Sequence, residues 1–487
     1  MADTKRPFSY HTFMFPFLFD NYKIKSFKKK LNSNWKEELY SDKLEQFSDV
    51  DYNTIHYFNT AAQSIIYTKS QKSPVVSNYI FDLGAGIDEN WLDSKKGIDN
   101  KAKYVIEKGD VKHALSINAI RLKLFNTGIG ILIFELENYS SGKEKDILWI
   151  NDFGRRIYMP FCANGKCSIC ADRVVLKFGD KYLTEDGIIP EKFKKSDDTV
   201  FAQPIVYLLG GNGFEPVIDD RMFVACYYKN AELIKHATEW DNGEYRCFSD
   251  ALNKKTNDKT NVSQLIYQFI CVDGDGSTCH DRNMIYKYLK EHIYSRWLEN
   301  YDESGNISGT LTGITEYSMV TISSNDEDFL TIPFLTQYVE MMLIVLAQRA
   351  SLLLFERLTF ENIGKKHDFI NLHKKYNEFQ GNLLLNELTS QQQGIELYNM
   401  LRANLFVNDR VADIENHIEK LSMQKSADIE SKENLILFII AVLGIIQAAD
   451  IIFNWLSLNI LPLWKILAGI LIVAPIIVKY ILNRYRG

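Results

Sequence analysis

The chain has 487 residues, of which 46% are hydrophobic and 24% charged, and a net charge of −6 at pH 7. This composition is typical of a globular protein of two or three domains, and the acidic balance argues against direct binding to nucleic acid. Seven cysteines, an odd number, favour a reducing compartment over a disulfide framework. The first residues contain no apolar run of the signal-peptide kind, so we expect the folded part to be cytoplasmic.

Residues 1–330 predict a cytoplasmic domain that mixes strands and helices, an α+β fold with an α/β-type domain. Alternating aromatic residues predict a strand over Ser9–Phe15 that ends at Pro16, and we interpret His11 as a packed strand histidine. A helix is expected at Thr54–Tyr67, and Asn126-Thr127-Gly128 is a hairpin signal. Further strands are predicted at Tyr104–Glu107, Ala114–Phe125, Gly130–Glu137, Ile205–Leu209, Val224–Tyr228 and Thr310–Ile322.

Two short stretches of this domain carry charged side chains suited to a ligand. Arg155 and Arg156 follow a glycine, and arginine forks suit phosphate or carboxylate groups, although a surface salt bridge explains the pair equally well. Asp219 and Asp220 precede a predicted strand. They could hold a metal ion or a ribose, or pair with Arg221.

Three other motifs are incomplete. Cys162, Cys167 and Cys170 form C-x4-C-x2-C without a second pair, so we interpret them as reduced thiols in a loop rather than a structural zinc site. The cluster Gly210–Gly213 lacks the Lys-Ser/Thr of a P-loop, and the calcium-like segment 273–277 lacks the glutamate of an EF-hand. Without a Ser/His/Asp, zincin or P-loop constellation, the sequence does not predict an enzyme.

Residues 331–432 predict a helical stalk domain. The segment Phe334–Leu358 is apolar but becomes polar toward its end, so we expect a core helix rather than a membrane span. A helical pattern then runs from His367 to Lys432, with apolar residues at spacings of three and four. This spacing is typical of an antiparallel helix pair or bundle.

Residues 433–487 predict two transmembrane helices joined by a tight turn. Each of the apolar runs Leu435–Phe453 and Ile460–Leu482 is close to the about 20 residues that a helix needs to cross a bilayer. Trp455 and Trp464 flank the turn, as in an aromatic belt. Basic residues lie beyond the two far ends, so the N-terminal domain and the C-terminus are expected in the cytoplasm. A buried helical hairpin of a soluble core is the alternative.

The first of these spans carries a polar seam. Gln447, Asp450 and Asn454 are spaced by three and four and therefore share one helix face. In a homo-oligomer they would form rings of amide and carboxylate groups around a pore, as cation paths often do. The alternative is that Asp450 simply reaches water at the membrane interface.

The layout resembles the CorA family of divalent-cation channels. The stretch Phe379–Tyr398, which reads FQGNLLLNELTSQQQGIELY, is similar to the stalk of a divergent branch of that family. This resemblance implies a cytoplasmic domain, a stalk helix that becomes the first span, and a pentamer. The Gly-Met-Asn signature of the family is absent, because its place reads Phe453-Asn-Trp-Leu-Ser457. A magnesium transporter without the usual filter therefore remains an alternative function.

Four upstream blocks resemble the CorA-like proteins found beside type III CRISPR systems: Tyr10–Phe17, Phe125–Gly130, Asn151–Tyr158 and Asp219–Phe223. That branch implies a membrane effector of antiviral defence in the bacterial inner membrane. The resemblance further implies that a nucleotide second messenger, such as an S-adenosylmethionine–AMP conjugate, opens the effector and that the open effector permeabilises the bilayer. Under this resemblance the candidate ligand-binding residues, with the two phenylalanines stacking on a base, are Phe13, Phe125, Asn126, Asn151, Arg155, Arg156, Asp219, Asp220 and Arg221.

Overall fold

The structure is a computed structural model, and most of the first 455 residues can be described in it. The described ranges are 6–19, 24–40, 48–68, 75–83, 102–158, 169–178, 181–182, 201–211, 213–218, 221–238, 262–274, 276, 278–324, 329–361 and 366–455. The chain forms two compact units, Met1–Ile414 and Glu415–Gly487. The division into three parts at 330 and 432 stays a prediction.

Within the described ranges, the first unit is built on one 13-stranded sheet, so the mixed α and β composition predicted from the sequence is confirmed. Its main path runs β11-β12-β13-β10-β1-β6-β5-β4-β7-β8, while β2 and β3 attach through β5 and β9 attaches to β1. All pairs are antiparallel except β10 with β13. The strands are β1 (Ser9–Phe19), β2 (Trp35–Glu38), β3 (Val76–Phe81), β4 (Ala102–Lys108), β5 (Val111–Phe125), β6 (Ile129–Asn138), β7 (Arg173–Phe178), β8 (Lys181–Tyr182), β9 (Phe214–Pro216), β10 (Phe223–Lys229), β11 (Ile293–Tyr294), β12 (Thr310–Ile314) and β13 (Ser318–Ser323).

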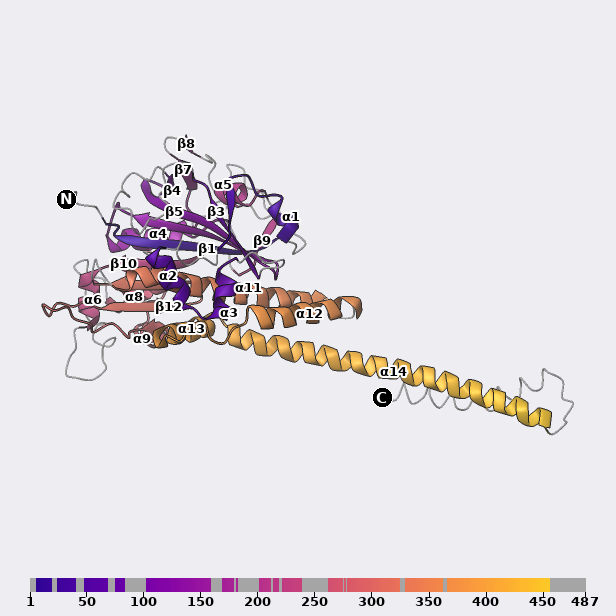
Figure 1. Ribbon diagram of the computed structural model, residues 1–487. Coiled ribbons are helices and arrows are strands. Elements are labelled where there is room, and N and C mark those ends of the chain that lie inside the picture. Colours follow the sequence, from indigo (N-terminus) through magenta and orange to yellow (C-terminus); the bar gives the residue numbers. More distant parts are fainter. Residues whose placement is uncertain are drawn as a thin grey trace. The chain divides into compact units, whose positions relative to one another are not determined.

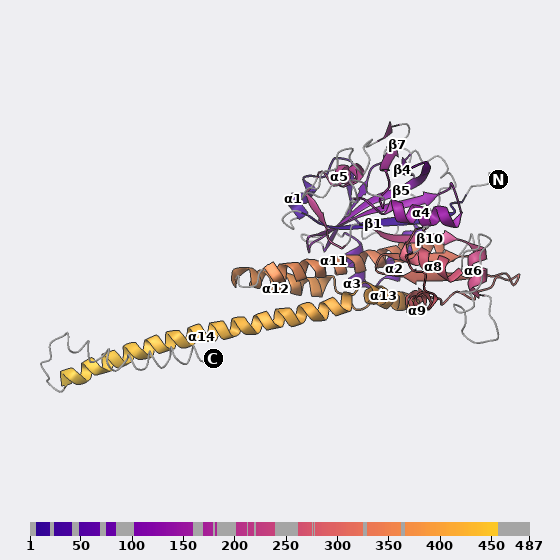
Figure 2. The ribbon, with the colours of Figure 1, turned by 180° about the vertical axis from the view of Figure 1, so that it is seen from behind.

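Helices cover both faces of this sheet, with α4 on one face and α11 on the other (Figure 1). A π-helical turn, η4 (Phe334–Tyr338), leads into α11. Figure 2 shows from behind that α12 and α13 lie beside α11. The helices are α1 (Ile24–Lys28), α2 (Asp49–Tyr57), α3 (Thr60–Ile66), α4 (Glu144–Gly154), α5 (Gln203–Leu208), α6 (Ala231–Thr238), α8 (Val262–Cys271), α9 (Arg282–His292), α10 (Thr331–Pro333), α11 (Val339–Glu361), α12 (Lys366–Asn382), α13 (Gln392–Asn404) and α14 (Val407–Trp455).

Strand β1 is central and longer than predicted, because Pro16 does not end it. On one side β1 pairs with β6 along nearly its whole length. On the other side it pairs with β10 up to Met14 and with β9 from Phe17, so none of the strands described here pairs with positions 15 and 16 on that side. Pro16 lies in this gap, where the absence of its N–H costs no ladder bond.

The two faces of the sheet differ in chemistry. On the α4 face, alternate residues of β1 form an aromatic core, with Phe15 stacked on Phe17 at a centroid distance of 5.8 Å. Burying such rings is a large favourable contribution to folding, about 1.5–3 kcal/mol for a Phe side chain. On the opposite face, Phe334 of η4 packs on Tyr227 of β10 at 5.3 Å.

Helix α11 is the main helix of that second face. By length and composition alone, Thr331–Phe360, which runs through α10, η4 and α11, is long and apolar enough to cross a membrane; the two spans expected within 433–487 stay predictions. The most apolar window of Thr331–Phe360 is 89% buried within the protein. The prediction of a core helix in this segment is therefore confirmed.

Three other predicted elements differ in the structure. Ile205–Leu209 was expected to be a strand but lies in α5, where Pro204 occupies the first turn; a short apolar run does not distinguish the two by periodicity. The expected helix Thr54–Tyr67 is divided into α2 and α3, because the Asn59 side chain caps a new helix by accepting from the Ala62 N–H. Residues Thr310–Ile322 form the hairpin β12–β13 rather than one strand.

The expected long helical pattern after His367 is divided into α12, α13 and the first part of α14. The link between α12 and α13 is held by Gln348 of α11, whose Nε2 donates to Leu383 O and to the Tyr398 hydroxyl, each at 2.9 Å. Phe406, with a φ of +57°, separates α13 from α14. Helix α14 then continues for 49 residues from the polar stalk sequence into the apolar run, so the predicted unbroken passage is confirmed.

Candidate functional site

Three of the predicted ligand residues come together in an arginine cluster, which we define as Arg155, Arg156 and Arg221 together with the Tyr317 ring that Arg155 and Arg221 contact. Arg156 and Arg221 form an antiparallel bridge, and the Met222 N–H donates to Arg155 O at 2.8 Å. The Arg221 guanidinium lies 4.9 Å from the centroid of Tyr317 and that of Arg155 lies 5.9 Å from it. Both distances are in the range of cation–π contacts.

The three arginines have different surroundings. Arg155 is 2% exposed, and its Nη2 donates to Val272 O at 2.9 Å. Arg156 donates through Nε and Nη2 to Asp152 Oδ1, at 3.1 and 2.8 Å. The Arg156 side chain is 13% exposed and Arg221 is also partly exposed, so this side of the cluster is the more accessible one. Its chemistry suits a phosphate or carboxylate group on the exposed side and structural support on the buried side.

The other predicted ligand residues are placed differently. Phe13 and Phe125 are 0% and 1% exposed, so neither ring is accessible to a base in this structure. Phe13 instead packs on Tyr104 at 5.9 Å. Asn126 lies in the β5–β6 turn, where its backbone N–H donates to Val75 O. Asp219 and Asp220 lie outside the described residues.

Asn151 is buried in α4 and holds His11 of β1. Its Oδ1 accepts from His11 Nδ1 at 2.7 Å, and Ser9 Oγ lies 2.8 Å from His11 Nε2, so the network assigns the neutral ring as donor through Nδ1. Burial lowers the pKa of His11 to about 4, although the hydrogen bond to Asn151 opposes the shift. The prediction of a packed strand histidine is confirmed.

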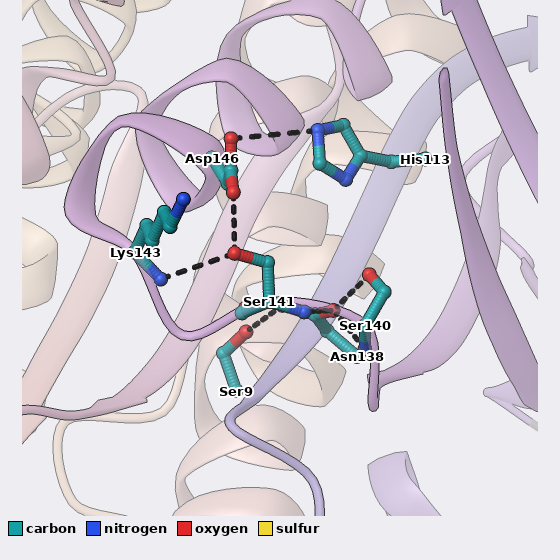
Figure 3. A network of polar contacts seen from close by, with 7 residues as sticks. All are labelled: Ser9, His113, Asn138, Ser140, Ser141, Lys143 and Asp146. Atoms are coloured by element: carbon teal, nitrogen blue, oxygen red, sulfur yellow. Dashed lines mark hydrogen bonds and ion pairs between the residues drawn. The ribbon is translucent and has the colours of Figure 1, made fainter. Parts of the chain in front are cut away.

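A second polar network lies where β6 leads into α4, and its order of contacts excludes a catalytic triad within it. Figure 3 shows Asp146 between two partners: Ser141 Oγ donates to Asp146 Oδ2, and His113 Nε2 lies 3.7 Å from Asp146 Oδ1. A nucleophilic serine needs the histidine, not the carboxylate, as its neighbour. Ser141 also accepts from the Lys143 N–H at 3.3 Å, so the network orders the start of α4.

A third charged region was not predicted from the sequence. A cavity of about 330 Å³ lies on the α11 face, lined by β2, β3, β5, β6, α2 and η4. Arg121 of β5 forms ion pairs with Glu135 of β6 and, at 3.1 Å, with Glu340 of α11. Lys123 lies 2.9 Å from the same glutamate. Alternation along β5 places Arg121 and Lys123 on one face, but the pattern alone cannot tell that a helix covers that face.

The electrostatics of this cavity follow from burial. Burial opposes the charge of Arg121, but the nearby carboxylates outweigh it and raise its pKa. Burial lowers the pKa of Lys123, opposed by Glu340. Burial also raises the pKa of Glu38, which Arg121 and Lys123 only partly offset.

The predicted pore residues lie in α14. Gln447 is exposed, and only the helical backbone is described for Asp450 and Asn454. The second apolar run, Ile460–Leu482, lies outside the described residues. Cys170 is buried, with its thiol 3.4 Å from Tyr158 O, whereas Cys162 and Cys167 also lie outside them. Among the described residues, no group of three His, Cys, Asp or Glu side chains is placed to hold a metal ion.

Comparison of the chain with family models, with curated proteins and with solved structures finds no match. A functional proposal for this protein therefore depends on its residues and their geometry, together with the resemblance described above.

Proposed function

We propose that this protein is a ligand-gated membrane effector, in which an anionic nucleotide bound at the arginine cluster opens a path through the bilayer. The proposal follows the resemblance to CorA-like effectors of type III CRISPR defence and assigns its parts to described elements. The single observation that carries it is a chain of contacts from the arginine cluster to the start of α14, the helix that contains the first apolar run.

The membrane part of the proposal depends on α14. Residues 435–453 of this helix rise by about 28 Å, at about 1.5 Å per residue, which matches a bilayer core of about 30 Å. Exposed aliphatic side chains are concentrated there: Leu435 36%, Ile436 57%, Leu437 62%, Ile439 48%, Ile440 58% and Ile451 69%. Such a surface favours lipid or other copies of the chain over water. Two spans per chain cannot enclose a pore, so the proposal requires a homo-oligomer.

The ligand part depends on the exposed side of the arginine cluster. Arg221 and Arg156 are partly exposed and present guanidinium groups that suit phosphate oxygens. Tyr317 supplies an aromatic ring beside them, in place of the buried Phe13 and Phe125. An adenine nucleotide messenger carries both phosphate and a stacking base, and it is therefore the ligand class that we propose.

The contacts that join this cluster to α14 pass through α11. Glu316, the residue before Tyr317, accepts through its carbonyl from Arg349 Nη1 of α11 at 3.2 Å. The Arg349 guanidinium lies 6.0 Å from the ring of Phe406, which directly precedes α14. Arg410 in the first turn of α14 is paired with Glu356 of α11 at 2.6 Å. A shift of Tyr317 on ligand binding would thus reach the start of α14 through packed groups.

Gating in this scheme is a shift between two populations. A nucleotide stabilises the arrangement of Arg221 and Tyr317 that binds it better. The contacts of Arg349 then couple this arrangement to the conformation of Phe406. The backbone of Phe406 is in the left-handed region, which is strained for a non-glycine residue, so the junction stores free energy that a change of state could release.

The test is ion flux from liposomes that contain the full chain, with and without a panel of adenine-nucleotide messengers. We expect flux with one messenger only. Arg221→Ala should abolish it, whereas Arg173→Ala, which removes a partly exposed arginine of β7 that is paired with Glu107 of β4, should not. Asp450→Asn should change the ion conducted, whereas Asp413→Asn in the first turns of the same helix should not.

Magnesium flux without any messenger would contradict the proposal and indicate a transporter with an altered filter. Messenger-dependent flux that survives Arg221→Ala would place the ligand elsewhere. Arg349→Ala completes the set: it should leave nucleotide binding in place, measured by calorimetry, and remove the flux that the nucleotide triggers.

A further inference from the structure

The cavity on the α11 face carries more negative than positive charge. Its lining includes five carboxylates and two cations. Lys123 is not part of the lining but adds a third cation, 2.9 Å from the carboxylate of Glu340. Lys36 pairs with Asp82 at 2.7 Å, while Arg121 and Lys123 pair with Glu135 and Glu340. Three of the five carboxylates are therefore paired with a cation, and two are not: Glu38, and Asp51, whose Oδ2 accepts from the Ser48 hydroxyl at 2.7 Å. In the described part of the chain, no Lys or Arg lies within ion-pair distance of either.

The surplus carboxylates lie beside two aromatic rings. Tyr40 and Tyr67 both line the cavity, with ring centroids 4.2 Å apart. Burial, together with the nearby carboxylates, raises the pKa of both phenols, so the rings remain neutral. Neutral aromatic faces attract cations, most strongly where water is excluded.

We propose that this cavity binds a small organic cation, with an ammonium or guanidinium group held by Glu38 and Asp51 and a short hydrocarbon body against Tyr40. The volume of about 330 Å³ is at the lower end of small-molecule sites. A bare metal ion fits less well, because Arg121 and Lys123 already occupy Glu135 and Glu340. The charge surplus also disfavours an anion, so this site differs in ligand class from the arginine cluster.

The position of the cavity connects its occupant to α11. Leu335 and Thr336 of the π-helical turn η4 line it, and Glu340 follows in the first turn of α11. π-Helical turns within helices are often found at functional sites, since a small change of hydrogen bonding shifts the residues beyond them. An occupant would therefore contact the same helix that carries Arg349.

The test is binding of putrescine, agmatine and spermidine to the detergent-solubilised full chain, by calorimetry and thermal shift, with succinate as an anionic control. We expect at least one amine to bind saturably at or below millimolar concentration and succinate not to bind. Glu38→Gln should weaken the amine at least about tenfold, which corresponds to about 1.4 kcal/mol. Asp51→Asn should weaken it as well.

The matched control is Glu37→Gln. Glu37 is the neighbour of Glu38 on β2 but accepts from Lys28 Nζ at 2.9 Å and from the Tyr79 hydroxyl at 3.2 Å, outside the cavity. It should leave amine binding unchanged. Glu38→Gln should also raise the melting temperature of the ligand-free protein, because a buried charge is removed; this readout shows that the variant is folded.

Failure of all three amines to bind, equal binding of succinate, or equal effects of Glu37→Gln and Glu38→Gln would each overturn this inference. None of these outcomes involves flux or nucleotides. The gated-effector proposal can therefore fail while the amine site stands, and the reverse.

Discussion

The two faces of the sheet bury polar groups in opposite ways. On the α4 face, burial lowers the pKa of His11 to about 4 and so keeps the ring neutral, while Asn151 and Ser9 provide hydrogen-bond partners for its two nitrogens. On the α11 face, Arg121 and Lys123 lie 3.1 and 2.9 Å from the carboxylate of Glu340. The His11 network is uncharged, whereas the second network pairs basic side chains with carboxylates and, among the described residues, leaves Glu38 and Asp51 without a basic partner. Burial therefore acts on an uncharged histidine network on one face and on a network of basic and acidic side chains beside a cavity on the other.

The largest expected effect is loss of the charge that α11 brings to the sheet. Glu340→Leu would leave Lys123 buried without its partner, and breaking a buried pair costs about 3–5 kcal/mol. Urea unfolding of the solubilised protein measures this cost. Glu356→Leu removes the partner of Arg410 from an ion pair that is more exposed than that of Glu340, and it should cost no more than about 1 kcal/mol. A loss of about 1 kcal/mol or less in Glu340→Leu would mean that the charges of the α11 face contribute little to stability.

The α4 face should instead respond to acid. Because the folded pKa of His11 is about 4 and its ordinary value is 6.5, the unfolded chain takes up the proton first. The stability contribution is therefore complete above pH 6.5 and is lost as the pH falls toward 4, by about 3 kcal/mol. His11→Gln should remove this slope from unfolding measured across that range. Substituting the exposed His56 in the same way should not, and a slope unchanged in His11→Gln would contradict the assignment.

The arginine cluster allows a finer division between support and binding. Arg155→Ala removes a buried donor to Val272 O and should cost about 2 kcal/mol of stability. Arg221→Ala removes a partly exposed contact with Tyr317 and should cost less than about 1 kcal/mol while abolishing nucleotide binding. Thermal unfolding and calorimetry on both variants separate the two roles. A stable Arg155→Ala protein would show that the buried arginine does not support the fold.

The smallest expected effect concerns Glu38. Its pKa is raised by burial, so the folded state holds the proton more tightly than the unfolded chain. Stability should therefore fall as the pH rises from the ordinary value of 4.5 through the raised one, and Glu38→Gln should lack this fall. Melting temperatures of the two proteins should converge at low pH and separate toward neutrality. Amine affinity in the parent protein should rise over the same window.

The sequence predicted those elements whose signals are local. The hairpin at Asn126-Thr127-Gly128 needs only a turn, in which Gly128 has a φ of +101°, between two alternating strands. Strand β1 was predicted but ended too early, because the gap between β10 and β9 beside Pro16 depends on other strands. The Arg155–Arg156 pair was found from its residue type. The sequence did not predict that Arg155 is buried and Arg156 partly exposed, because this difference depends on how the loop at Val272 packs.

The sequence by itself determined the mixed composition, the apolar run of α14 and the alternation of β5, because each is a period along one segment. Only the tertiary structure decided what covers each face. Alternation places Arg121 and Lys123 opposite Ile120 and Leu122, and such a polar face usually meets water. Here α11, more than two hundred residues away in the chain, covers it and supplies one glutamate. Solvation of a charge depends on neighbours distant in sequence, and no local pattern records them.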